Sequence, residues 1–111
     1  MDYKLIAYWT DTGKVPFYDW LDKLSDKEAQ ITIRLRLDRM RMGNFGTCTP
    51  VGTGIYELKF YIGPGYRVYF SKVGSKIVLL LCGGDKGSQA KDIAKAKKYL
   101  EIYKMRGEKH G

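Results

Sequence analysis

The sequence is poor in the residues on which many hydrolytic and metal-dependent sites rely. Its 111 residues include one histidine, His110, and two cysteines, Cys48 and Cys82. A histidine-based triad or dyad is not expected, because His110 belongs to a tail, 106–111, that is predicted to fray. Three such residues far apart in the chain form neither a metal-ligand cluster nor a disulfide framework. We therefore expect no metal and no other cofactor.

Long apolar runs are also absent. The run Ile77 to Cys82 is long enough for one buried strand, whereas a membrane-spanning helix needs about 20 apolar residues. The N-terminal MDYKLIAYWTDTG lacks the pattern of a secretory signal peptide. Cys82 lies within the apolar run, where a free cysteine behaves as a small hydrophobic residue. These features predict a protein of the reducing cytoplasm.

Basic residues, by contrast, are abundant. The chain has 20 Lys and Arg against 12 Asp and Glu, which gives a formal net charge of +8. An excess of this size on a small domain attracts polyanions, of which nucleic acid is the commonest. The alternatives are a charge that serves only solubility and a charge that matches an acidic protein partner.

The apolar pattern predicts one α+β domain over 1–111, with its core at about 3–103. A strand is expected at 3–10, followed by a hairpin of two helices that begin at Pro16 and after Ser25 or Asp26. The second helix has an apolar stripe with two supporting residues. The stripe is Ala29, Ile33, Leu37 and Met40, supported by Ile31 and Leu35.

The glycine-rich segment 43–54 is expected to be a loop. Three strands of a meander should follow within 55–82, and a lysine-rich helix should run from about 89 to 105. The predicted order is β-α-α-β-β-β-α, a twisted antiparallel sheet with helices packed on one face. The other face of the sheet would be open to solvent.

Strand alternation gathers polar side chains on that open face. They are Glu57, Lys59 and Tyr61 on one strand and Arg67 and Tyr69 on the next. Arg67 lies in an apolar and aromatic strand, where a charge must be exposed or paired. One interpretation is an edge arginine paired with Glu57, worth a few tenths to ~1 kcal/mol. The other is a functional cluster beside the loop that carries Lys86.

Arginine, lysine and tyrosine without histidine favour phosphodiester chemistry. Their side chains orient a phosphate, stabilise the charge that develops on it and, with a lowered pKa, transfer protons. RNA supplies its own nucleophile, the 2′-hydroxyl, so the protein needs only to align it and move protons. The cluster therefore predicts metal-independent cleavage of RNA rather than of DNA.

The loop after the apolar run, 83–89, has two interpretations. It is either a plain connection in which Asp85 or Ser88 caps the next helix, or a rigid edge that presents Lys86 and Gln89. Its GGDKGS segment lacks the spacing of a nucleotide-binding P-loop.

Three segments together resemble a known family. They are VPFYDWLDKL, IYELKF…GPGYRVYF and IVLLLCGGDKGSQAKDIAKAKKY. The chain resembles the phage-derived, HigB-like branch of the RelE/ParE toxin superfamily, the addiction-module killer proteins of type II toxin–antitoxin systems. The resemblance runs from about residue 3 to 103 and implies a RelE-like fold. The Gly-Tyr-Arg strand start and the GGDK-x-x-Q-x-x-D-I run are its most specific parts.

The resemblance implies an endoribonuclease, or mRNA interferase, that enters the ribosomal A site and cuts mRNA. It also implies a cognate antitoxin, a small protein with a helix-turn-helix or a partly disordered segment. Two alternatives stay open. One is a ParE-like, non-enzymatic inhibitor of DNA gyrase, and the other is a non-catalytic RNA-binding or degenerate phage protein.

The resemblance also implies roles for individual residues. Arg67 matches the strand arginine that contacts the scissile phosphate, Lys86 a basic residue after the last strand, and Lys59 a basic residue with an acid–base or phosphate role. Further RNA contacts are expected from Tyr61, Tyr69, Gln89 and Lys91. For the family's C-terminal tyrosine, the candidates are Tyr99 and Tyr103.

Overall fold

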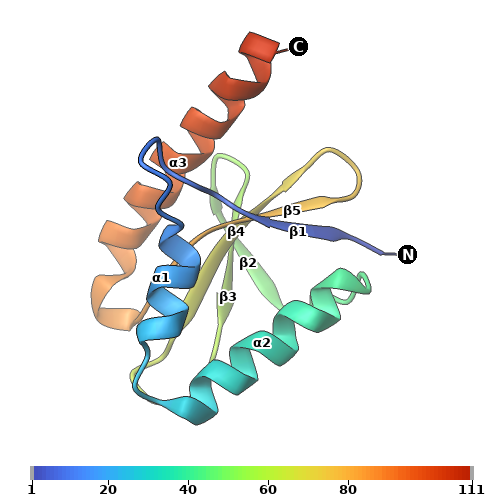
Figure 1. Ribbon diagram of the computed structural model, residues 1–111. Helices are drawn as coiled ribbons and strands as arrows, with labels where there is room; N and C mark the ends of the chain where they lie inside the picture. The colour runs from blue at the N-terminus through green and yellow to red at the C-terminus, as the bar shows by residue number, and fades with distance from the viewer. Residues whose placement is uncertain (1, 111) are drawn as a thin grey trace.

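Five strands and three α-helices make up the part of the chain that a computed structural model describes, residues 2–110, with side chains to residue 107 (Figure 1). In chain order they are β1 (Lys4–Ala7), α1 (Pro16–Lys23), α2 (Lys27–Arg41), β2 (Cys48–Gly52), β3 (Ile55–Lys59), β4 (Arg67–Val73), β5 (Ile77–Gly84) and α3 (Gln89–His110). A 3-10 turn, η1 (Lys86–Ser88), leads into α3.

The strands form one mixed sheet in the order β1-β5-β4-β3-β2. The predicted α+β domain is confirmed at this level. The expectation of a wholly antiparallel sheet is wrong, because β1 lies parallel to β5 while the other pairs are antiparallel. The connection from β1 to its parallel partner β5 is long and contains both helices and the strands β2, β3 and β4.

The strand β2 replaces part of the loop expected at 43–54. Thr53 and Gly54, both with positive φ, form the tight turn that folds β2 back on β3. Pro50 pairs with Tyr56 and is tolerated because β2 is an edge strand. The glycines and the proline suggested a loop, but here they belong to a hairpin.

Helices cover both faces of the sheet, so the expectation of one covered face is also wrong. On one face, α1 and α2 pack residues such as Phe17 and Ile33 against Phe70. On the other face, α3 packs Ala96 and Leu100 against inward residues of β3, β4 and β5 (Figure 1). The unbroken apolar run of β5 fits a strand that is buried on both sides.

The helix boundaries agree closely with the sequence pattern. Pro16 opens α1, and Asp26 caps α2 by accepting a hydrogen bond from the backbone N–H of Ala29 at 3.0 Å. The predicted support of the α2 stripe by Ile31 and Leu35 is wrong: these side chains are 60% and 54% exposed and face away from the core.

The last helix is longer than expected. α3 continues to His110 rather than ending near 105, and of the tail only Gly111 lies outside the described residues. Within the described part of the chain, no helix has the length and apolar character needed to cross a membrane.

Candidate functional site

Four of the predicted site residues, Arg67, Lys59, Tyr69 and Gln89, meet at Glu57, a carboxylate in β3 that is only 2% exposed. Its Oε2 accepts hydrogen bonds from the Tyr69 hydroxyl and from Nε2 of Gln89, each at 2.9 Å. The same oxygen lies 3.5 Å from Nε of Arg67, and Oε1 lies 4.0 Å from Nζ of Lys59. One buried carboxylate therefore binds side chains from β3, β4 and the start of α3.

The register of the sheet explains most of this convergence. Glu57 lies opposite Tyr69 and Lys59 lies opposite Arg67, so all four side chains share one face. Gln89 is the first residue of α3, the helix that covers that same face. A buried carboxylate is costly unless donors surround it, and these residues supply them.

Arg67 is buried in the middle of the sheet rather than at an edge. β4 is the central strand, and Arg67 is only 8% exposed. Its Nη1 donates to the Gly65 carbonyl oxygen at 2.8 Å. Its Nε has no hydrogen-bond partner among the described residues and depends on the nearby Glu57 charge. The predicted pairing with Glu57 is present, but in a buried setting, where removing either partner would leave the other charge buried and uncompensated.

Lys86 lies beside Arg67 on the exposed turn η1. Both residues lie close to Gly65, which has a positive φ of 77°. A β-carbon at Gly65 would lie 3.3 Å from Nη1 of Arg67 and 3.7 Å from Cβ of Lys86. The absence of a side chain at Gly65 thus leaves room for both cationic residues.

The loop 83–89, which carries Lys86, is held by hydrogen bonds between its own residues. The Asp85 side chain accepts from the backbone N–H of Ser88 at 3.1 Å, and Oγ of Ser88 accepts from the Asp85 backbone N–H at 3.2 Å. This capping box supports the interpretation in which Asp85 caps the turn. Oγ of Ser88 also donates to the buried Asp92.

Both glycines of that loop are required by close neighbours. A β-carbon at Gly84 would lie 1.8 Å from Oδ2 of Asp92, and one at Gly83 would lie 2.2 Å from Cε3 of Trp20. Much of the GGDK-x-x-Q-x-x-D-I run is therefore structural. It fixes the turn that exposes Lys86 and aims Gln89 at Glu57.

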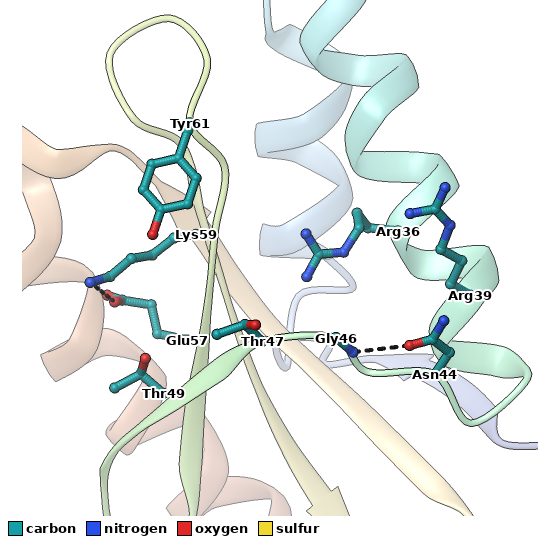
Figure 2. Close-up of a pocket in the computed structure, with 9 residues that line it drawn as sticks. All are labelled: Arg36, Arg39, Asn44, Gly46, Thr47, Thr49, Glu57, Lys59 and Tyr61. Carbon is teal, nitrogen blue, oxygen red and sulfur yellow. Dashed lines mark hydrogen bonds and ion pairs between the residues drawn. The ribbon is translucent and has the colours of Figure 1, made fainter.

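An open pocket of about 380 Å³ adjoins Glu57 (Figure 2). Its lining residues come from α2, the following loop, β2, β3 and the segment just after β3. They are Arg36, Arg39, Asn44, Gly46, Thr47, Thr49, Glu57, Lys59 and Tyr61. Tyr61 is 92% exposed, which leaves its ring free to contact a ligand. With three cationic side chains and one carboxylate, the pocket favours an anionic ligand.

Tyr69 does not face this pocket, which corrects its predicted role in RNA binding. Its side chain is completely buried and cannot contact a bound RNA strand. Burial, together with the hydrogen bond to Glu57, raises the pKa of the Tyr69 hydroxyl well above its ordinary value. Tyr69 therefore holds Glu57 in place as a neutral hydrogen-bond donor.

Lys91 and the two C-terminal tyrosines lie elsewhere. Lys91 lines a separate pocket of about 400 Å³ with Trp20. Tyr99 stacks on Tyr8 with ring centroids 4.6 Å apart, and burial raises the pKa of its hydroxyl. Tyr103 packs edge-on against the exposed Trp9.

Sequence reasoning missed the central position of Glu57 and the presence of Arg36 and Arg39 in the pocket. The sequence pattern predicts Glu57 only as a partner of Arg67, on the same face as Lys59 and Tyr61. No local signal linked α2 to β3, because the two elements meet only in the folded domain.

An uncharacterized protein of Haemophilus influenzae is 47% identical to this chain over 81 residues, which are 73% of this chain and 82% of that protein. No family model matches the sequence.

Proposed function

We propose that this chain, which belongs to the same family as the uncharacterized H. influenzae protein, is an endoribonuclease that cleaves RNA beside Glu57. One observation carries the proposal. Arg67, Lys59 and Gln89, from separate parts of the chain, converge on one buried carboxylate, and Lys86 lies beside Arg67. That carboxylate and Lys59 also line an open, cationic pocket, whereas Arg67, Gln89 and Lys86 lie outside its lining.

The substrate supplies the nucleophile. The 2′-oxygen of a ribose attacks the adjacent phosphorus, and the bond from phosphorus to the 5′-oxygen breaks. The products are a 2′,3′-cyclic phosphate and a 5′-hydroxyl, so one proton leaves the 2′-oxygen and one reaches the 5′-oxygen. No water is consumed in this step.

The position of each residue indicates its role in this reaction. Arg67 and Lys86 bind the phosphate and stabilise the charge that develops on its oxygens. Glu57 and Lys59 both line the pocket; the carboxylate accepts the 2′ proton and the lysine supplies one to the 5′-oxygen. The exposed Tyr61 ring stacks on an unpaired base.

Within this proposal the chain is a toxin of a type II toxin–antitoxin module, of the HigB-like branch of the RelE/ParE superfamily. The resemblance implies the order β-α-α-β-β-β-α, and the chain has one strand more, the edge strand β2. The partners are mRNA, the ribosome with cleavage at the A site, and a cognate antitoxin that keeps the toxin inactive.

Induced expression in a bacterial host tests the proposal. The wild-type chain should arrest growth and leave transcripts with 2′,3′-cyclic phosphate and 5′-hydroxyl ends. Lys86→Gln should lower the cleavage rate about tenfold or more, since it removes a cation from the phosphate without touching the core. Lys98→Gln, which removes another exposed charge, from α3, should cleave like the wild type.

Three results would overturn the assignment. Equal activity of Lys86→Gln and Lys98→Gln would remove Lys86 from the site. Trapped DNA breaks with an SOS response and intact mRNA would indicate the gyrase-inhibitor alternative. RNA binding with a steep salt dependence, but without cleavage on or off ribosomes, would indicate a non-catalytic RNA-binding protein.

A further inference from the structure

We infer that Arg36 and Arg39 of α2 form a second phosphate-binding site, which holds the RNA backbone next to the cleavage position. Both residues line the pocket beside Glu57, and neither belongs to the Arg67–Lys86 pair (Figure 2). The identity of the ligand as RNA rests on the proposed function. The existence of an anion site on α2 does not.

The four arginines of α2 differ in a way that singles out this pair. Arg34 pairs with Asp22 at 2.7 Å, and Arg41 pairs with Asp38. Among the described residues, no carboxylate lies within ion-pairing distance of Arg36 or Arg39. The arginines with acidic partners lie outside the pocket, and the two inside it keep their charge available for a ligand.

Arg36 is held ready for such a ligand. Its guanidinium lies over the Phe60 ring, 5.4 Å from the centroid, and is half-buried. Gly46 provides the space behind it, because a β-carbon there would lie 3.1 Å from Nη2 of Arg36. A half-buried cation without a counter-charge gains free energy when an anion binds. Arg39 follows one turn later, about 5–6 Å away along the same helix side.

The lining of the pocket fits a phosphodiester better than an acidic protein. Side-chain hydroxyl and amide donors from Thr47, Thr49 and Asn44 complete the wall, and Tyr61 provides the aromatic ring. Specific protein interfaces have an apolar core, whereas phosphate oxygens are bound by arginine, hydroxyl and amide donors. The exposed Tyr61 ring suits a single strand, whose bases are free to stack.

The register of the sheet indicates a path for the bound RNA strand. Lys59 lies opposite Arg67 and also lines the pocket that Arg36 and Arg39 share. An RNA strand whose reacting phosphate faces Arg67 and Lys86 passes Lys59 and then reaches α2. Arg36 and Arg39 thus bind flanking phosphates and act as positioning residues.

Binding to a 2′-O-methyl RNA oligonucleotide tests the inference without cleavage, because the nucleophile is blocked. Fluorescence anisotropy over a range of salt concentrations compares two double variants of equal charge. Arg36→Gln/Arg39→Gln should weaken binding about tenfold or more at low salt and flatten the log–log salt slope by about 1.4, or 0.7 per lost phosphate contact. Arg34→Gln/Arg41→Gln should change affinity less than threefold and leave the slope intact.

Each other outcome has a defined meaning. Equal losses in both double variants, or no loss in the first with its circular dichroism spectrum intact, would overturn the inference. So would poly-glutamate that competes as well as RNA and depends as strongly on Arg36 and Arg39, since the partner would then be an acidic protein. If the binding pattern holds but unmodified RNA of the same sequence is never cut, with or without ribosomes, the phosphate site stands and the endoribonuclease proposal falls.

Discussion

Replacing Glu57 by glutamine keeps the shape of the side chain and removes its charge. The amide oxygen can still accept from Tyr69 and Gln89, which now meet Oε2 at 2.9 Å. Arg67, only 8% exposed and 3.5 Å from that oxygen, loses its counter-charge. The variant therefore isolates the electrostatic role of the carboxylate from its packing.

The expected loss in the free energy of unfolding follows from the distance between the two charges. Two unit charges 3.5 Å apart attract by about 5 kcal/mol at an effective dielectric constant of 20. Removing the carboxylate also ends the cost of burying its charge, so the net loss is smaller. Breaking a buried pair by deleting one partner costs about 3–5 kcal/mol in general. Because two hydrogen bonds survive here, we expect the free energy of unfolding to fall by about 3 kcal/mol.

Urea unfolding followed by tryptophan fluorescence and far-UV circular dichroism measures this loss. Glu101→Gln, which neutralises an exposed glutamate on α3, is the matched control and should change stability by less than about 0.5 kcal/mol. Arg67→Met combined with Glu57→Gln should be less destabilised than the sum of the single variants, by about 1–3 kcal/mol. If Glu57→Gln unfolds like the control, or if the single effects simply add, the carboxylate does not hold Arg67.

Two further predictions concern the loop and the alkaline stability. Gly84→Ala should lower the free energy of unfolding by about 2 kcal/mol or more, because the new methyl group meets Oδ2 of Asp92 at 1.8 Å. The control, Gly107→Ala, lies in a helix and has no atom within 4 Å of the new methyl group, so it should stabilise the protein by about 0.5–1 kcal/mol. Equal effects of the two substitutions in urea unfolding would contradict the predicted clash at Gly84. Burial, with a smaller contribution from Asp92, raises the pKa of the Cys82 thiol from 9.0 to about 12. The native state therefore keeps a proton that the unfolded chain releases, so this contribution to stability is complete below pH 9 and is lost as the pH rises towards 12, by up to about 1.4 kcal/mol per pH unit. Urea unfolding between pH 8 and 11 should show a shallower decline for Cys82→Ala than for the wild type, and parallel declines would refute the assignment.

Local patterns in the sequence were sufficient for the secondary structure around the site. The period of two along 55–61 and 66–73 put Glu57, Lys59 and Arg67 on one face, and the register of β3 and β4 agrees. The helix start at Pro16 and the cap at Asp26 also follow from local chemistry. Such features depend on residues a few positions apart, so the sequence alone expresses them.

The errors have a common origin in long-range contacts. β1 pairs in parallel with β5, far away in the chain, and no local pattern distinguishes this pairing from an antiparallel one. The hairpin of β2 and β3 was hidden because Thr53 adopts a positive φ that is uncommon for threonine. The burial of Tyr69 required knowing that α3 covers the face that was expected to be open.

The sequence by itself determined the basic charge, the α+β class and the shared face of Lys59 and Arg67. These properties follow from composition and from the two- and 3.6-residue periods of strand and helix. The tertiary structure decided that Glu57 is buried and that Gln89 reaches it from 32 positions away. It also decided that Arg36 and Arg39, which have no acidic partner in the described part of the chain, line the same pocket as Glu57. Those facts depend on which face each helix covers, and that choice is made by the packing of the whole core rather than by any one segment.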